Sequence, residues 1–539
     1  MIPPVNPLYS LNVHCCDEIG GPTPLALNTE WLLTDGMGGF AMGTVSGCAT
    51  RRYHGLLVAA ARPPVERFNT LVSMAETVRL GDRSHSLDCN EYLSPEHHSL
   101  FHPHGYQYLR RFEKAAGAVH WHYRIEGWSV TKELRLVWRK SAAVITYTIE
   151  PPADTPAAGE LTLELLPLLG MRDFHQQRRR EWGDPFHVHA SNGPDGATLR
   201  VDADVPVPLY IQAPDCAFSA RRDWWHNFYR RREAERGQDC LEDLFAPGAF
   251  VCTLGGQAEA RSVRLYVSTE PIDRAALDTG DGREEHLRRL DSKVENRRSN
   301  VQALESPSDV EPANFQRLVA ASDDFVVTRY IAGSEFRTIL AGYPWFADWG
   351  RDTMISLPGL LLCTGRLEEA AQTLITFARH IRSGLVPNRF DDYGGEPHYN
   401  TVDASLWFIH ACLEYRRLCT DRRVWRQLLS SACQQILRAY MEGTDGPIQM
   451  DSDGLIAAGN EQTQLTWMDA KRDGVAFTPR HGKCVEINAL WHRALAGCAE
   501  AMWDEDAPAA AEYERLAKKA REAFHQTFCP KSWATSWTM

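Results

Sequence analysis

The sequence lacks the features that would assign it to several large classes of protein. It contains no run of 18 or more apolar residues, so no membrane span is predicted. Its first residues have neither the charged nor the apolar segment of a secretory signal, so we expect a cytoplasmic protein. The formal net charge of −12 argues against nucleic acid or an anionic membrane as a partner. The basic clusters Arg178–Arg180 and Arg230–Arg232 have glutamates nearby, and we expect solvated structural faces there.

Cysteine and glycine are present without the spacings that would give them a chemical role. The 14 cysteines include no Cys-x-x-Cys pair, and a disulfide framework is unusual in a chain of 539 residues. We therefore expect buried, reduced thiols, no metal site and no cofactor. The glycine cluster Gly36–Gly43 has neither GxGxxG nor P-loop spacing, so no nucleotide site is expected.

The first half of the chain is predicted to be an antiparallel β-sandwich. Its apolar segments are short and alternating, and Gly, Pro and Asp clusters separate them. Between Arg221 and Phe245 the pattern becomes polar and aromatic, and we expect a helix or irregular structure there. The clearest predicted strands are Ala142–Ile149, Glu160–Leu166, Ala197–Val201 and Ser262–Val267.

The second half shows a helical period from about Asn314 onward. The charged stretch Arg283–Arg298 predicts a linker helix, and Ser306–Ser308 marks a boundary. We expect a β-sandwich domain at residues 1–280, linker helices at 281–312 and an α/α-barrel domain at 313–539. The predicted helices are Phe315–Val327, Arg351–Leu362, Arg366–Ile381, Val402–Leu418, Arg422–Met441, Lys483–Met502 and Ala507–Phe528.

Successive helical hairpins joined by long aromatic and acidic loops predict an α/α toroid with the loops at its mouth. A closed ring of about twelve helices needs more than roughly 300 residues. Only residues 313–539 follow the linker, and the segment after Phe528 has no helical period. We therefore expect either an incomplete ring or a smaller helical fold.

The segment from Tyr343 to Thr353 combines aromatic rings, two carboxylates and one guanidinium. Aromatic rings stack on pyranose faces, while Asp and Arg bind sugar hydroxyls, so Asp348, Arg351 and Asp352 are candidate sugar ligands. The alternatives are a buried aromatic turn with a local ion pair and, for Asp352, a helix cap.

Asn400, Asp403 and Trp407 share one face if a helix begins near Thr401. The alternative is that Asn400 or Thr401 caps that helix and Trp407 packs in the core.

Asp469 lies beside Trp467 in a predicted loop, where an aromatic wall can desolvate a carboxyl group as a general acid requires. Lys483 and Glu486 are one helical turn apart, and a local ion pair between them is the alternative to a role in a site.

Four segments in the same order resemble motifs of the C-terminal glucosidase domain of glycogen-debranching enzymes. They are Tyr343–Leu360, Gly384–Trp407, Leu465–Asp469 and Gly482–Trp491. Glu30–Val45 and Thr50–Leu56 resemble the N-terminal domain of the bacterial and archaeal members. The resemblance extends to about residue 528.

The resemblance implies a β-sandwich followed by an (α/α)6 barrel with amylo-α-1,6-glucosidase activity, and no transferase domain. It implies that Asp469 is the general acid, and we add Glu486 as a second catalytic-site carboxyl. The family's catalytic base lies beyond these motifs, so we expect a chain truncated at its C-terminus and weakly active or inactive. The implied sugar-binding residues are Trp345, Arg351, Asp352, Asn388, Tyr399, Asn400, Asp403, Trp407, Trp467 and Lys483.

The expected substrate is glycogen or a branched malto-oligosaccharide, cleaved with inversion. Two alternatives stay open. One is another α/α-barrel glycosidase of the glucoamylase or trehalase type, and the other is a glycan-binding protein without turnover.

Overall fold

The computed structural model describes residues 9–12, 21–94, 96, 98–115, 117–152, 160–254, 259–279, 282–300, 312–391 and 393–529. The chain divides into two compact units, Met1–Arg289 and Leu290–Met539. The division falls inside helix α4 (Gly282–Asn300), in the stretch predicted as a linker helix. The predicted boundary at Ser306–Ser308 and the segment from residue 530 onward lie outside the described residues.

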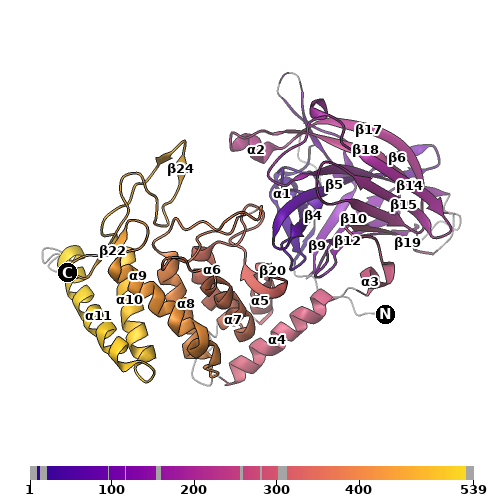
Figure 1. The fold of residues 1–539 in the computed structure, drawn as a ribbon. Helices are drawn as coiled ribbons and strands as arrows, with labels where there is room; N and C mark the ends of the chain where they lie inside the picture. Colours follow the sequence, from indigo (N-terminus) through magenta and orange to yellow (C-terminus); the bar gives the residue numbers. More distant parts are fainter. Residues whose placement is uncertain are drawn as a thin grey trace, which may run out of the picture. The chain divides into compact units, whose positions relative to one another are not determined.

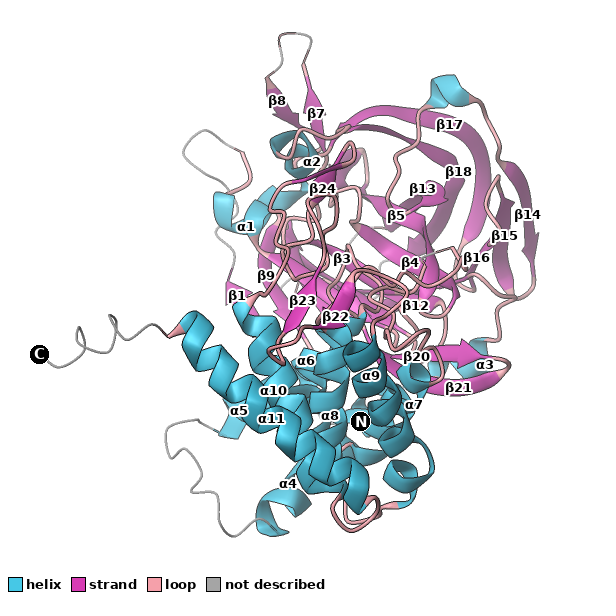
Figure 2. Ribbon diagram, turned by 60° about the vertical axis from the view of Figure 1, so that its left-hand side comes forward, coloured by secondary structure: helices cyan, strands magenta, loops and turns pink. Residues whose placement is uncertain are grey.

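Two antiparallel sheets build the first unit (Figures 1 and 2). The first sheet has the order β1 (Tyr9–Asn12), β9 (Leu109–Lys114), β10 (Ala118–Ile125), β11 (Trp128–Leu136), β12 (Ala142–Glu150), β19 (Arg261–Ser268), β16 (Leu209–Ala213), β15 (Gly196–Asp202) and β14 (His187–Gly193). The second has the order β2 (Glu30–Thr34), β3 (Phe40–Thr44), β4 (Gly55–Arg62), β5 (Val65–Leu80), β13 (Leu161–Asp173), β18 (Leu241–Leu254), β17 (Ala217–Tyr229), β7 (Glu91–Leu93) and β8 (Ser99–Phe101), with β6 (Arg83–Ser86) beside β5. Short helices are α1 (Pro24–Asn28), α2 (Arg231–Glu235) and α3 (Arg274–Asp278), with 3-10 turns at Gly105–Gln107 and Arg180–Trp182.

One hydrophobic core takes side chains from both sheets. Along β11, alternate residues such as Val130 and Leu134 are buried, which is the period expected of a strand with one face in a core. Trp31 of β2 meets Trp121 of β10 edge to face, with ring centroids 5.4 Å apart. The four clearest predicted strands overlap β12, β13, β15 and β19. The first unit is therefore the antiparallel β-rich region that the sequence predicts.

The expectation of a helix or irregular structure between Arg221 and Phe245 is wrong for most of that segment. Strand β17 continues to Tyr229 and pairs with β18, and only the five residues of α2 are helical. Most of β17 is exposed, so its polar and aromatic residues carry no alternating pattern. The pairing with β18 decides the conformation instead.

Buried charge is paired inside the first unit. Arg230, expected on a solvated face, is 2% exposed and donates to Glu242 at 2.7 Å. Glu242 also accepts a hydrogen bond from Arg172. The solvated face was the wrong interpretation for Arg230, because a buried guanidinium needs a carboxylate partner that the local sequence does not identify.

The described cysteines are free thiols, and most are buried.

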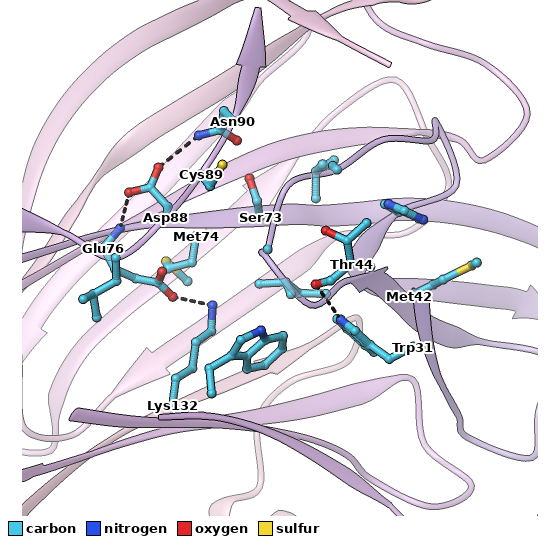
Figure 3. A pocket seen from close by; sticks show the side chains of 18 of the residues that line it. Trp31, Met42, Thr44, Ser73, Met74, Glu76, Asp88, Cys89, Asn90 and Lys132 are labelled. Carbon is cyan, nitrogen blue, oxygen red and sulfur yellow. Dashed lines mark hydrogen bonds and ion pairs between the residues drawn. The ribbon is translucent and has the colours of Figure 1, made fainter. Parts of the chain in front are cut away.

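A second polar cluster surrounds a cavity of about 40 Å³ in the first unit (Figure 3). Lys132 forms an ion pair with Glu76. The Tyr147 hydroxyl also donates to Glu76, at 2.7 Å. Asn90 donates to Asp88 at 3.0 Å, and burial, with the charge of Glu76, raises the pKa of Asp88 to about 7. The cavity has room for a few water molecules only, so we assign this cluster to the structure of the unit.

Helices dominate the second unit (Figure 1). They are α5 (Pro312–Asp324), α6 (Gly350–Leu357), α7 (Leu367–Ala378), α8 (Ala404–Leu418), α9 (Ser430–Glu442), α10 (Val485–Met502) and α11 (Ala507–Phe528), with π-helical turns at Pro358–Leu362 and Trp425–Leu429. Three short hairpins lie between them: β20 (Val326–Ile331) with β21 (Ser334–Ile339), β22 (Ile448–Met450) with β23 (Ile456–Ala458), and β24 (Lys471–Arg472) with β25 (Val475–Ala476).

The described helices form an open array around one core (Figure 1). Helix α8 packs against both α6 and α10, and α11 packs along α10. A closed (α/α)6 ring is not seen in the part of the chain that the structure describes. Val326 and Val327, predicted to end the first helix, begin β20 instead, because this β-branched run pairs with Ile339 and Thr338 of β21.

Candidate active site

Arg351 connects the two carboxylates at the centre of the predicted site. Its Nε donates to Oδ2 of Asp403 at 2.7 Å, and its Nη1 donates to Oδ2 of Asp469 at 2.9 Å. Its Nη2 donates to the carbonyl oxygen of Thr466 at 3.1 Å. One guanidinium therefore joins the first turn of α6, the residue before α8 and the loop between β23 and β24.

The position of Arg351 depends on the glycine before it. A Cβ at Gly350 would lie 2.0 Å from the carbonyl oxygen of Pro387, so only glycine allows this close approach. The N–H of Gly350 donates to the carbonyl oxygen of Asn388 at 2.8 Å. The start of α6 is thereby tied to the loop that leads to α8.

Thr401 holds the side chain of Asp403 by a hydrogen bond at the start of α8. The Thr401 hydroxyl oxygen accepts the N–H of Ala404 at 3.2 Å and donates to Oδ1 of Asp403 at 2.7 Å. Thr401 therefore satisfies a backbone group at the start of α8, as the capping alternative proposed. The carboxylate of Asp403 has its other oxygen on Arg351, so capping and site geometry occur together.

The two carboxylates on Arg351 differ in their access to solvent. The side chain of Asp403 is 3% exposed, and that of Asp469 is 23% exposed. Burial acts to lower the pKa of Arg351, but Asp403 and Asp469 outweigh it and raise that pKa. The guanidinium therefore stays charged, and Asp469 is the more solvent-exposed carboxylate of the pair.

Asp352 lies in the first turn of α6 and is not its N-cap residue. The surrounding protein desolvates its carboxyl and raises the pKa of Asp352, although the residue remains solvent-exposed. Arg351 opposes this shift, and the negative charges of Asp469 and Asp403 add to it. Asp352 therefore belongs to the same group of charges.

Asp348 is fully buried and bound by protein groups. Arg329 donates to both of its oxygens, at 2.7 and 2.5 Å, and the Thr338 hydroxyl donates at 2.9 Å. The hairpin β20–β21 is thereby attached to the loop before α6. Such a carboxylate positions the loop and is not exposed to a ligand.

The predicted aromatic ligands differ in exposure. Trp467 is 56% exposed, two residues before Asp469. Trp407 is half-buried and lies edge to face with His410, and Trp345 is half-buried beside Phe346. The Tyr399 hydroxyl donates to the carbonyl oxygen of His380 at 2.8 Å, which fixes its ring. Trp467 is therefore the predicted ring with the most surface available for stacking.

The two predicted asparagines lie in different environments. Asn388 is 1% exposed, and its Oδ1 has no hydrogen-bond partner among the described residues. Asn400 is exposed just before Thr401. A buried, unpartnered amide oxygen is costly, so Asn388 is able to accept a hydrogen bond from a bound group.

Lys483 and Glu486 do not pair with each other. Lys483 forms ion pairs with Asp451 and Asp453, both at 2.7 Å, and these carboxylates raise the pKa of Lys483. Glu486, in the first turn of α10, holds Arg480 with both carboxylate oxygens. Tertiary partners thus replace the local ion pair that the spacing allowed.

The structure brings Arg351, Asp352, Asp403 and Asp469 into one charged group. It gives separate partners to Asp348, Tyr399, Lys483 and Glu486. Sequence reasoning missed Thr466, whose backbone carbonyl binds Arg351, and Arg480, which binds Glu486. Every residue type has a backbone carbonyl, so the residue type at position 466 does not indicate this contact. Arg480 lies in a polar loop, where an arginine carries no distinguishing pattern.

Among the described helices, none is long and apolar enough to span a membrane.

Two protein-family models match the chain. Residues 29–261 match the family described as "Glycogen debranching enzyme N terminal", and residues 320–537 match "Amylo-alpha-1,6-glucosidase". The second match extends past Phe528, where the motif resemblance ends.

One curated relative is the glycogen debranching enzyme of Saccharomyces cerevisiae, which is 30% identical over a segment covering 31% of this chain and 15% of the yeast protein. Among solved structures, a bacterial glucoamylase complexed with acarbose has a TM-score of 0.49 at 10% identity, covering 97% of this chain and 68% of that one. A rhamnosidase from Klebsiella oxytoca with rhamnose bound has a TM-score of 0.31 at 12% identity, covering 88% of this chain and 72% of that one.

The two family models describe successive parts of debranching enzymes, and they match this chain in the same N-to-C order and without overlap. With the yeast enzyme as a sequence relative, the chain belongs to the glycogen debranching enzyme family.

Proposed function

We propose that the chain is a glycoside hydrolase that removes single α-1,6-linked glucose stubs from glycogen or branched malto-oligosaccharides. The observation that carries the proposal is that Arg351 donates hydrogen bonds to both Asp403 and Asp469. All three residues lie in the segment that matches the amylo-α-1,6-glucosidase family. Glycoside hydrolysis needs a carboxyl group placed against the glycosidic oxygen, and this cluster holds one at a partly exposed position.

Asp469 takes the role of general acid in this proposal. It is the more exposed carboxylate on Arg351, so it is the one that the leaving oxygen can approach. Arg351 and Asp403 act as positioning residues, because they fix the carboxyl group in one orientation. Trp467 offers an exposed ring beside it for stacking on a pyranose face.

Glu486 is the second carboxyl assigned to the site. Its side chain is 30% exposed, and Arg480 holds it at the start of α10. The family resemblance implies inversion at the anomeric carbon, so we expect β-glucose as the first product, measurable by proton NMR.

The remaining predicted residues contact the glycan or support those that do. Asp348 supports the loop before α6 from its buried position. The assigned contacts are Trp345, Asp352, Asn388, Tyr399, Asn400, Trp407 and Lys483.

The test is free glucose released from a malto-oligosaccharide that bears one α-1,6-linked glucose stub. We expect weak release by the parent chain and a further loss of about 10²–10⁴-fold in Asp469→Asn, which is the usual contribution of general acid–base catalysis. Asp473→Asn is the matched control, because Asp473 is 91% exposed in the turn between β24 and β25 and should leave the rate unchanged.

Substrate choice separates this proposal from its alternatives. Preferred release from linear α-1,4 chains or from trehalose would favour a glucoamylase- or trehalase-type enzyme. Saturable glycogen binding without glucose release, unchanged in Asp469→Asn, would favour a glycan-binding protein without turnover. The description of the family that matches residues 320–537, amylo-alpha-1,6-glucosidase, favours the α-1,6 linkage.

A further inference from the structure

A second pocket lies in the first unit, and its lining includes none of the residues assigned to catalysis. It has a volume of about 580 Å³, within the range of about 300–1,000 Å³ typical of ligand sites. Arg52 lines it from the turn between β3 and β4, inside the Thr50–Leu56 segment that the proposed function leaves without a role. The segment after β13, from His175 to Trp182, and the loop before β18 line the rest.

The positive charges in this pocket already have partners. Arg52 donates to the carbonyl oxygens of His175 and Asp239, at 2.6 and 3.2 Å, and its Nε lies 3.3 Å from Glu233. Arg179, also in the lining, donates to Asn227 at 3.1 Å and faces Asp243. An anionic ligand would have to compete with these carboxylates, so the pocket suits a neutral, polar ligand.

Several other lining groups are polar without being cationic. Burial lowers the pKa of His175 to about 4, so its imidazole is neutral at pH 7. The Tyr53 hydroxyl lies 3.1 Å from its Nδ1 and fixes the ring. Glu181 and Asp239 add exposed carboxylates, which accept hydrogen bonds from hydroxyl groups.

Gln177 lines the pocket with an unsatisfied amide. The residue is 8% exposed, and neither its Oε1 nor its Nε2 has a hydrogen-bond partner among the described residues. Leaving such a group unpaired is unfavourable. An amide offers one acceptor and one donor side by side, which matches two adjacent hydroxyl groups of a sugar.

Trp182 completes the pocket with a flat apolar surface. It is 69% exposed, and it ends the 3-10 turn Arg180–Trp182. A lone exposed tryptophan on a surface needs no explanation. Here the ring adjoins a buried amide, a neutral imidazole and two carboxylates, the combination that binds a pyranose by stacking and hydrogen bonds.

We propose that this pocket is a second carbohydrate site, which holds a neutral glucan segment through Trp182 and Gln177. The choice of a glucan as the sugar rests on the proposed function, whereas the preference for a neutral polyhydroxyl ligand rests on the pocket alone. The site would retain a branched polymer on the enzyme between successive cleavages.

The experiment measures retention of the full chain on glycogen by affinity electrophoresis. We expect Trp182→Ala to weaken the apparent affinity about tenfold, equivalent to one good contact. Trp503→Ala is the matched control, because Trp503 is 55% exposed at the end of α10, and it should retain glycogen like the parent. Equal retention in Trp182→Ala and the parent, or loss of the parent's retention on adding inorganic phosphate, would overturn the proposal.

Gln177→Leu gives a second, independent measurement. We expect weaker retention with an unchanged or higher melting temperature, because the substitution removes an unpaired buried amide. A lower melting temperature with unchanged retention would assign the amide to the fold and contradict a role in binding.

Glucose release from the short stub-bearing oligosaccharide is followed in the same preparations. If the parent releases no glucose while Trp182→Ala still loses glycogen retention, the proposed hydrolase function fails and the second site stands. If release is normal while both variants keep full retention, the second site alone fails.

Discussion

At the scale of single residues, the site depends on one arginine that serves two carboxylates. Arg351 lies 52 residues from Asp403 and 118 residues from Asp469 in the sequence. Removing the guanidinium would leave Asp403, 3% exposed, without its cationic partner. Breaking a buried ion pair from one side costs about 3–5 kcal/mol.

We therefore expect Arg351→Ala to lower the free energy of unfolding by about 3–5 kcal/mol, measured by urea denaturation. Adding Asp403→Asn should restore part of the loss, because the unpaired charge is then removed. Arg472→Ala is the control, since Arg472 is 82% exposed in β24. A change within about 0.5 kcal/mol for Arg351→Ala, as at an ordinary surface position, would contradict this account.

Asp35 predicts a pH dependence of the first unit. It is 2% exposed, its Oδ1 accepts the N–H of Met37 at 2.7 Å, and burial raises its pKa to about 7. Between about pH 4 and pH 7, Asp35 therefore stays protonated in the folded chain, whereas in the unfolded chain it has already lost its proton. This stabilisation is complete below about pH 4 and is lost as the pH rises through about 7.

We expect thermal melting at several pH values to show Asp35→Asn gaining stability relative to the parent between about pH 4 and pH 8. The gain should reach up to about 4 kcal/mol, because three pKa units at 1.36 kcal/mol each are involved. Asp82→Asn, at an exposed turn position, is the control. Parallel pH profiles for Asp35→Asn and the parent would show that the carboxyl does not titrate in this range.

At the scale of elements, the start of α6 is fitted against the loop before α8. The carbonyl oxygen of Pro387 occupies the place of a Cβ at Gly350, and Asn388 accepts the Gly350 N–H. A shift here would displace Arg351, which binds the carboxylates of Asp403 and Asp469. Small displacements of a positioning group reduce rates strongly.

We expect Gly350→Ala to lower glucose release by at least about tenfold and to destabilise the second unit, measured by initial rates and thermal melting. Gly359→Ala is the control within the next turn, because a Cβ there meets nothing within 4 Å. That substitution should stabilise slightly, by about 0.5–1 kcal/mol. Equal rates in both variants would mean that the close approach at Gly350 does not hold the site in place.

At the scale of the whole molecule, the chain consists of two units with separate hydrophobic cores. Ile145 belongs to the first core and Leu495 to the second, and both are 0% exposed. We expect calorimetry to resolve two transitions, with Ile145→Ala and Leu495→Ala each lowering its own. The loss per substitution should be about 2–5 kcal/mol. One shared transition, lowered equally by both variants, would show that the units unfold together.

Sequence patterns predicted elements well where one face meets a core. Strand β15 and helix α10 show their periods clearly, and their predicted ranges overlap the observed ones. The prediction missed strand β17 because both of its faces are largely exposed, so its sequence has no hydrophobic alternation. The β-branched pair Val326–Val327 directly follows a helical period, and its pairing with Ile339 and Thr338 of β21 makes it a strand instead.

The sequence by itself determined the broad class of the protein, the change from strands to helices, and the motifs that carry the family resemblance. These are local properties, set by residue type and spacing. Only the tertiary structure decided which charges meet. It placed Asp403 and Asp469 on Arg351, paired Lys483 with Asp451 and Asp453, and buried Asp348 against Arg329. The physical reason is that a charge takes its partner, and its degree of desolvation, from segments that packing brings together, and sequence spacing does not encode that proximity.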